Sequence, residues 1–462
     1  MLSNFLWGRS AGVVAGLAYT FAPYHLLTVY SYEGWGEMLA FVYPPLLLYL
    51  LLYAIHHFQF HTTKGRVVFG VTILVWVLFI LTHNISSFIT SPILVMLALI
   101  VSQKTNTSRL YIGTILLLVA MISAFFVIPA ITLTPTIKIP ALLEKEMALR
   151  SQYMFPLIAQ LRSSVSVLWT NRITYREFTI GIPLFIASIM GIISLAYQWL
   201  IQKRHMHPLF PVLMGVLFVS LFLVDPISDL YYTFRPLQYV LYPYRFLFVA
   251  TFAGSLVAGY LLRKNFLAGI LFIIVAVIFG YPFAHPNMDK FSFPRTYFSR
   301  PQMLGFAVPT LKTMGIAEFL PLSADINFLV REEQKFLNQG IVPEKIILPP
   351  DSGSILRSSV KQESLQLTIV ANHPLVLTVS TLYYPNWTAS IDQKRVPVSP
   401  DAFGRITLHV PTGTHDILLR FGYSAMEKLG WCISIVGIIL FLLFLLFPRI
   451  IHKTIPKGIK TT

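Results

Sequence analysis

The sequence predicts a polytopic α-helical membrane protein of about ten spans, with a mixed, β-rich extracytoplasmic domain before the last span. Hydrophobic residues make up 55% of the 462 positions and charged residues only 12%. The mean hydropathy is +0.69, far from the value of an ordinary soluble domain. Apolar runs of membrane-spanning length recur along the chain, and one polar stretch of about 144 residues interrupts them near the end.

The ten predicted spans are uninterrupted apolar runs, and the third and fourth are short. Polar residues 82–87 join these two, which predicts either a tight hairpin or a partly re-entrant pair. The spans are Ser10–Tyr30, Glu37–Ile55, Val67–Leu81, Phe88–Val101, Leu110–Leu133, Phe178–Leu200, Pro208–Val224, Arg245–Leu262, Phe266–Ala284 and Leu429–Phe447.

The charges predict the orientation. With the N-terminus inside, the inner segments hold no acidic residue, so that all 19 acids fall outside. The inner basic residues are Arg9, Lys64, Arg66, Lys104, Arg109, Lys203, Arg204, Arg263, Lys264, Arg449, Lys453, Lys457 and Lys460. By the positive-inside rule both termini are cytoplasmic, and the net charge of +16 is directed at anionic lipid rather than nucleic acid.

We therefore divide the chain into a multispan domain at 1–284, an extracytoplasmic domain at 285–428 and a last span with a basic inner tail at 429–462. An outer loop at 134–177 belongs to the first domain. Its apolar residues recur at helical spacing, which is typical of helices lying in the membrane interface, and Pro156 is expected to begin the second of them.

The second half of the extracytoplasmic domain alternates with period two. Four runs show this pattern: Leu365, Leu367 and Ile369; Leu375, Leu377 and Val379; Ile406, Leu408 and Val410; Ile417, Leu419 and Phe421. They predict at least four antiparallel strands. The first half is expected to be mixed, with a helix near Ala324–Asn338. The single cysteine, Cys432, excludes a disulfide within the chain.

The stretch Asp225–Ala250 carries acids and arginines between two apolar runs. Charges are costly in hydrocarbon, so these side chains must lie at the interface or in a wet cavity. Two interpretations remain open. One is interfacial anchoring by tyrosine and arginine, and the other is the wall of a site for a phosphorylated lipid.

Several other polar residues are expected at the same outer surface. Arginine forks suit phosphate oxygens, and a nearby carboxylate suits a general base or a metal-held pyrophosphate. The phosphate- or substrate-binding candidates are Arg245, Arg235, Arg150, Arg176, His83, Asp225 and Asp229. Arg150 has a second interpretation, in which it extends to the lipid headgroups.

Motifs of soluble enzymes are missing from the sequence, as are a zinc-ligand set and a nucleotide-binding loop. No cofactor is certain, although a divalent metal would suit a pyrophosphate. The glycosylation sequons at Asn84, Asn106 and Asn386 are short enough to arise by chance.

Three stretches resemble a bacterial multispan family labelled "6-pyruvoyl-tetrahydropterin synthase-related membrane domain". They are residues 18–24 (AYTFAPY), 32–37 (YEGWGE) and 242–246 (YPYRF). Residues 384–392 and 411–415 are similar to the terminal β-module of proteins grouped with GT-C glycosyltransferases. The resemblance implies a GT-C-like fold and a polyprenyl-phosphate sugar donor, but not pterin chemistry.

The same resemblance implies a catalytic acid in the first long outer loop. This chain departs from that pattern, as though its start were late and the loop missing, which leaves Glu37 and Glu33 as the catalytic candidates. The expected function is glycosyl transfer at the outer face during cell-envelope glycan modification. The alternative is a non-catalytic protein of envelope glycan assembly, either a carrier of lipid-linked sugar or a scaffold.

Overall fold

The computed structural model describes residues 1–30, 34–56, 62–102, 106–138, 153–170, 178–202, 207–240, 242–285, 319–340 and 344–446. The chain divides into two compact units. The membrane unit comprises Met1–Ser123, Glu146–Ser292 and Ile433–Thr462, and the β unit comprises Ala124–Lys145 and Phe293–Cys432.

Seven stretches of the described chain are helices long and apolar enough to cross a membrane. Up to ten spans result if each of three bent helix pairs counts as one. The described helices are thus those of a multi-pass membrane protein, while the number ten stays a prediction. The seven are Trp35–His56 (α4 and α5), Thr63–Thr82 (α6), Asn84–Val101 (in α7), Ile182–Ile201 (α12 and η3), Pro243–Leu262 (η5 and α15), Phe266–Ala284 (α16 and η6) and Ala425–Leu446 (α20).

Two of the three bent pairs break at a proline. Pro23 begins α3 (Pro23–Tyr30) after α2 (Arg9–Thr20), with a bend of 45°. Pro226 begins η4 (Pro226–Thr233) after α13 (Leu209–Val224), with a bend of 90°. The third pair is α8 (Asn106–Ile122) and α9 (Ala124–Leu133), where the membrane unit gives way to the β unit.

The predicted polar loop 82–87 is mostly helix. Only His83 separates α6 (Thr63–Thr82) from α7 (Asn84–Ser102), and both helices are longer than expected. The His83 side chain accepts a hydrogen bond from the Ser86 backbone N–H at 3.2 Å, which satisfies one of the unpaired donors at the start of α7. The polar run is therefore a helix cap and a first turn, which hydropathy alone does not distinguish from a loop.

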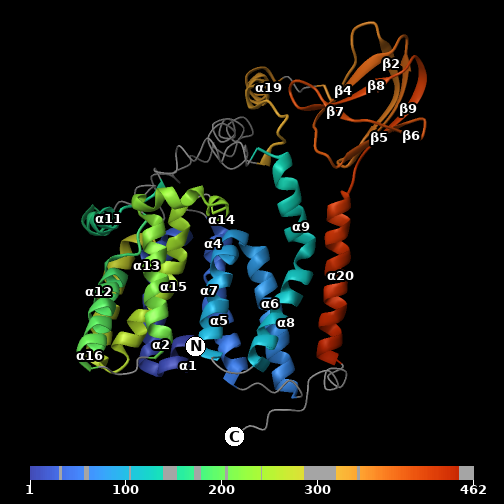
Figure 1. The fold of residues 1–462 in the computed structure, drawn as a ribbon. Coiled ribbons are helices and arrows are strands. Elements are labelled where there is room, and N and C mark those ends of the chain that lie inside the picture. The colour runs from blue at the N-terminus through green and yellow to red at the C-terminus, as the bar shows by residue number, and fades with distance from the viewer. Residues whose placement is uncertain are drawn as a thin grey trace. The chain divides into compact units, whose positions relative to one another are not determined.

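Helix α15 (Phe246–Leu262) lies within the membrane unit, and all of its residues except Leu261 are buried. Small side chains such as Ala253, Ala258 and Gly259 let neighbouring helices approach closely. A Cβ atom added at Gly259 would lie 2.7 Å from the carbonyl oxygen of Ala11, so α15 and α2 touch backbone to backbone there. Figure 1 shows α13 and α15 side by side in green.

The β unit holds two antiparallel sheets that face each other (Figure 1). Their strand orders are β1-β4-β8-β7 and β2-β3-β9-β5-β6. The strands are β1 (Ile346–Ile347), β2 (Gly353–Val360), β3 (Ser364–Ala371), β4 (Leu375–Leu382), β5 (Trp387–Ile391), β6 (Lys394–Val396), β7 (Ser399–Pro400), β8 (Arg405–Val410) and β9 (Gly413–Phe421).

The period-two pattern correctly predicted β3, β4, β8 and β9. Every predicted inward residue of these strands is buried except Phe421, which is 36% exposed at the end of β9. The predicted helix near Ala324–Asn338 is confirmed as α19 (Ile326–Gln339).

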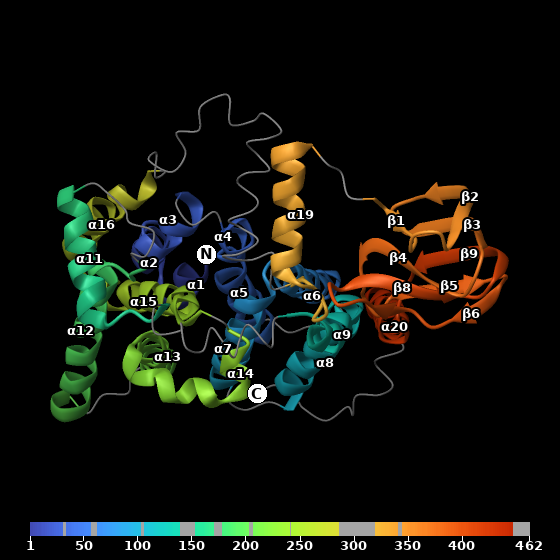
Figure 2. The same ribbon diagram turned by 90° about the horizontal axis from the view of Figure 1, so that it is seen from above.

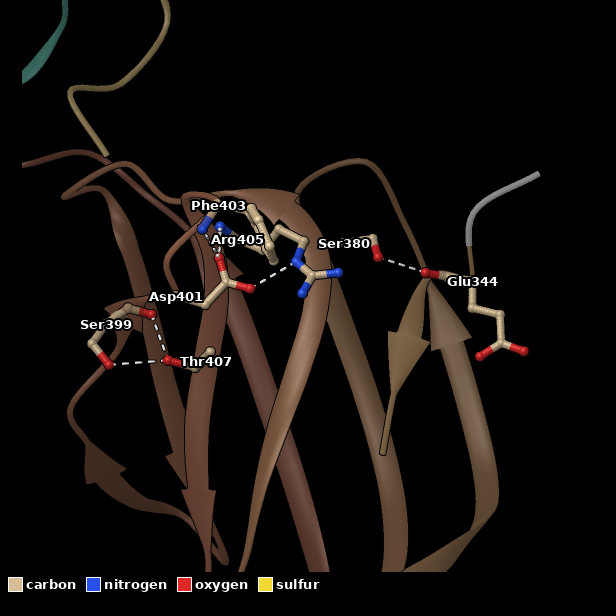
Figure 3. A network of polar contacts seen from close by, with 7 residues as sticks. All are labelled: Glu344, Ser380, Ser399, Asp401, Phe403, Arg405 and Thr407. Carbon is tan, nitrogen blue, oxygen red and sulfur yellow. Dashed lines mark hydrogen bonds and ion pairs between the residues drawn. The ribbon is translucent and has the colours of Figure 1, made fainter. Parts of the chain in front are cut away.

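One end of the β unit is tied together by polar contacts (Figure 3). Arg405 Nε donates to Asp401 Oδ2 at 2.7 Å, and the guanidinium also lies 5.2 Å from the Phe328 ring of α19. Phe328 in turn stacks on Phe403 at 4.3 Å. Because the Phe328 and Phe403 rings and the arginine stack in this way, α19 is fixed against the loop that precedes β8.

Asn386 joins the start of β5 to the start of α20. Its side-chain amide donates to the Gly422 carbonyl at 3.0 Å and to Glu427 Oε2 at 2.6 Å. Glu427 Oε2 also accepts from the Ser424 backbone N–H, and Ser424 Oγ accepts from the Glu427 N–H, which is a capping box. Asn386 is only 7% exposed, so its sequon is an internal structural feature.

Replacing Asn386 with alanine is expected to destabilise the β unit by about 2 kcal/mol, because the hydrogen bonds from its buried amide to the half-buried Glu427 carboxylate and to the Gly422 carbonyl are lost. Thermal unfolding of the full chain in detergent measures the effect. The matched control is Asn372→Ala, whose amide makes one exposed bond of 3.2 Å to a backbone carbonyl. Equal unfolding midpoints for the two variants would show that the Asn386 contact contributes nothing.

His415 and Asp392 form an ion pair whose strength depends on pH. Nδ1 of His415 lies 2.7 Å from Asp392 Oδ2. The hydrogen bond that His415 donates to the Asp392 carboxylate raises the pKa of His415 and lowers the pKa of Asp392. The stabilisation from the histidine is complete below its unfolded pKa of about 6.5 and is lost as pH rises through the higher folded pKa.

As pH rises from 6 to 9, we therefore expect the unfolding temperature of the wild type to decrease relative to that of His415→Gln. The stabilisation from Asp392 is lost only in stronger acid, as pH falls through its lowered pKa. Parallel pH profiles for the two proteins above pH 6 would contradict the role of the pair.

Candidate functional site

Glu37 is the one buried carboxylate among the described residues of the membrane unit, with 2% of its surface exposed. It lies in the first turn of α4 (Trp35–Ala40), and the Tyr24 hydroxyl from α3 donates to its Oε1 at 2.6 Å. Gly36 allows this placement, because a Cβ there would lie 2.9 Å from the Thr82 carbonyl oxygen. A buried carboxylate must be paired or hydrogen-bonded, and Tyr24 meets part of that need.

Arg245 provides the positive charge near Glu37. It ends the short helix η5 (Pro243–Arg245) at the start of α15, and its guanidinium interacts electrostatically with the Glu37 carboxyl. Nη1 donates to the Val240 carbonyl at 2.8 Å, and the guanidinium lies 4.9 Å from the Tyr242 ring. These contacts fix the direction of the side chain.

His83 lies at the same end of the helices, between α6 and α7. Burial, and to a smaller extent the nearby Arg245 charge, together lower the pKa of His83 to about 4. The imidazole is therefore neutral near pH 7. Because Nδ1 accepts from the Ser86 N–H, the remaining proton is on Nε2, which can act as a hydrogen-bond donor.

Aromatic rings pack near the Tyr24 ring. Phe178 stacks on Tyr244 at 4.0 Å, and Tyr24 lies 6.1 Å from Phe178 and 6.5 Å from Tyr244. Tyr242 stacks in turn on Tyr244 at 5.5 Å. Tyr24 and Arg245 thus both lie against aromatic rings, and an apolar environment strengthens electrostatic interactions.

Three of the predicted site residues lie near one another: Arg245 is within electrostatic range of Glu37 and His83, and a Cβ at Gly36, next to Glu37, would lie 3.4 Å from the His83 ring. Asp225 has a different role, because its carboxylate accepts from the Ile227 N–H at the start of η4 and from the Leu157 N–H at the start of α11 (Leu157–Thr170). It is a double helix cap. Asp229 and Arg235 are exposed on η4 and α14 (Arg235–Gln238).

The predictions for Glu33, Arg150 and Arg176 lie outside the described residues. The expected beginning of a helix at Pro156 is confirmed, since α11 starts at Leu157. The helical spacing in this loop also placed Met154 and Leu161 on one interfacial face, which is wrong for Met154, because it lies before α11 and is only 4% exposed.

Tyr24 was missed by the sequence reasoning. Tyrosine is common at membrane interfaces, and only the fold shows that this hydroxyl is aimed at a carboxylate 13 positions away. The signal was the stretch AYTFAPY itself, which was noticed as a motif without a role.

Metal ligation has no support in the part of the chain that the structure describes, where no three histidine, cysteine, aspartate or glutamate side chains come together. Glu37 provides a carboxylate as a hydrogen-bond acceptor, Arg245 a guanidinium that can bind an anion, and His83 a neutral imidazole that can donate a hydrogen bond.

Comparison with protein-family models, with curated proteins and with solved structures finds no match to this chain.

Proposed function

We propose that the chain is a GT-C-like membrane glycosyltransferase, which transfers a sugar from a polyprenyl phosphate at the outer face of the membrane to a cell-envelope glycan. The observation that supports this best is the buried Glu37 carboxylate held by Tyr24 near the Arg245 charge, at the ends of membrane-spanning helices. A lipid-linked substrate needs this combination, since its tail stays in the bilayer while its phosphate requires a cation at the border.

In the proposed reaction the oxygen of an acceptor hydroxyl bonds to the anomeric carbon of the donor sugar. The bond between that carbon and the phosphate oxygen breaks, and its electron pair leaves with the polyprenyl phosphate. Arg245 stabilises the negative charge of this leaving group, and the Glu37 carboxylate takes the proton of the acceptor hydroxyl. The Nε2–H of His83 donates a hydrogen bond to the phosphate.

One observation favours a second candidate, a non-catalytic carrier of lipid-linked sugar or a scaffold. Glu37 is 2% exposed and already accepts a hydrogen bond from Tyr24, which suits a structural carboxylate. In that case Arg245 and His83 bind the phosphate and no bond is broken.

Transfer from a labelled polyprenyl-phosphate sugar by the full chain in nanodiscs tests the proposal. The variants are Glu37→Gln, which retains an acceptor oxygen for Tyr24, and Arg245→Lys, which retains the charge but not the fork. We expect at least a hundredfold loss of turnover for Glu37→Gln with donor binding preserved, and weaker donor binding for Arg245→Lys.

Donor binding without turnover in the wild type would favour the carrier. Unchanged turnover in both variants would remove these residues from the mechanism. Glu363→Gln, an exposed substitution in the β unit, is the matched control and should change neither quantity.

The proposed orientation places both termini in the cytoplasm and the β unit outside. Cys432 is the only cysteine, so a Cys432→Ser background allows single cysteines to be placed at exposed sites such as Thr414. A membrane-impermeant thiol reagent added to whole cells should label Thr414→Cys, and protection from that reagent would reverse the orientation.

A further inference from the structure

The segment that follows α13 exposes large apolar side chains. We name Pro226–Gln238, which comprises η4 and α14, the elbow. In Figure 2 α13 is seen nearly end-on, while the yellow-green chain after it runs sideways to α14, in agreement with the 90° bend. The exposed apolar residues of the elbow are Ile227 (78%), Leu230 (76%), Tyr231 (56%) and Phe234 (64%).

Internal contacts fix the orientation of the elbow. Asp225 caps η4 through the Ile227 N–H, and Ser228 Oγ donates to the Asp225 carbonyl at 2.8 Å. The Tyr232 side chain is 1% exposed, and its hydroxyl donates to the Leu223 carbonyl at 2.8 Å. Asp225, Ser228 and Tyr232 thus hold the elbow against the protein, while its large apolar side chains are exposed together with Asp229 and Arg235.

The apolar surface of the elbow is continuous with the exposed surface of α13. Val219 and Phe222 of that helix are 58% and 38% exposed, as expected for side chains that face lipid. The Phe222 ring lies 5.5 Å from the Tyr231 ring. Exposed apolar side chains therefore continue from α13 onto the elbow, across the 90° bend between the two helices.

We propose that the elbow is a membrane anchor that lies in the plane of the bilayer border. Ile227, Leu230 and Phe234 insert among the upper acyl chains, and the exposed Arg235 beside them pairs with lipid phosphate. Segments that combine outward apolar residues with an interfacial tyrosine and arginine bind in this way. An exposed apolar patch of this kind in water would be a liability.

The anchor also has a consequence for Arg245. The chain leaves α14 and reaches Val240, whose carbonyl holds the Arg245 guanidinium at 2.8 Å. The depth of the elbow in the bilayer therefore sets the depth of that arginine. This proposal concerns lipid contact alone and holds whether or not the chain transfers a sugar.

Nitroxide accessibility measured by electron paramagnetic resonance tests the anchor. Single cysteines are introduced into the full-length Cys432→Ser chain as Ile227→Cys, Leu230→Cys and Phe234→Cys, spin-labelled and reconstituted in phosphatidylcholine and phosphatidylglycerol vesicles. Val219→Cys serves as the lipid reference and Thr414→Cys, on an exposed position of β9, as the water reference. The elbow positions are largely exposed, so the substitutions remove little packing.

At all three positions we expect collisions with oxygen relative to a water-soluble nickel chelate to be several-fold more frequent than at Thr414→Cys, with values that place the labels shallower than Val219→Cys. Values equal to those of Thr414→Cys would place the elbow in water and overturn the proposal. Labels shielded from both reagents would also overturn it, because a second protein surface would then cover the elbow.

Discussion

Replacing Glu37 with alanine is expected to lower the free energy of unfolding of the membrane unit by about 3 kcal/mol. The variant removes the acceptor of the 2.6 Å bond from Tyr24 and the negative charge near Arg245, in a place where little solvent can compensate. Loss of intrinsic tryptophan fluorescence on heating the purified chain in detergent measures the effect.

Two further variants separate the contributions. Tyr24→Phe removes only the hydroxyl, and Glu37→Gln removes the charge while an acceptor oxygen remains, so each is expected to cost less than Glu37→Ala. In the double variant Tyr24→Phe with Glu37→Ala the two losses should not add, because the residues share one bond. Full additivity would show that the contact carries no energy of its own.

Replacing Gly259 with valine is expected to have the second large effect, a destabilisation of about 3 kcal/mol or a failure to fold. The new Cβ would lie 2.7 Å from the Ala11 carbonyl oxygen and 2.9 Å from both Ala15 Cβ and Ser3 Oγ. Since a backbone atom is among these neighbours, no side-chain rotation relieves the overlap, and α15 must move away from α2.

Gly16→Val is the matched control, because Gly16 lies on α2 and a Cβ there has no neighbour within 4 Å. Both changes carry the same loss of backbone freedom and the same β-branched side chain. The difference in the monodisperse fraction by size-exclusion chromatography therefore reports the helix contact. Equal yields for the two variants would contradict close packing of α15 on α2.

Strands β3, β4, β8 and β9 were predictable because burial on one face of a sheet imposes a period of two on the sequence, whereas β2 and β5 were not predicted. Leu365, Leu367 and Ile369 alternate in the sequence and are all buried. Strands β1, β6 and β7 have two or three residues each and were not predicted, since so short a run carries no period. Their pairing depends on partners distant in the sequence.

The candidate site was predictable in part. Glu37, His83 and Arg245 attracted attention because charged or titratable groups are scarce in apolar sequence. The same rule also selected Asp225, which caps two helices. A carboxylate at the end of a span looks the same in the sequence whether it meets a substrate or a backbone N–H group, and only the third dimension separates the two.

The spans show the same limit. Hydropathy located the apolar runs, but it does not detect a bend such as the 90° turn at Pro226. The segment after the span that ends at Val224 was therefore predicted as a loop, whereas the structure has the short helices of the elbow there. The polar run 82–87 was also predicted as a loop, whereas most of it is helical and the His83 side chain caps the start of α7.

The lengths of the outermost strands bear on how the β unit behaves at high concentration. Of the four edge strands in the two described sheets, β1, β6 and β7 have at most three residues that could pair with a neighbouring chain. Only β2 presents eight, and there the pairing is irregular between Ile355 and Arg357. A strand from a second molecule that paired with β2 would meet an irregular strand and the charged Arg357 side chain. The β unit is therefore protected against edge-to-edge aggregation into fibres.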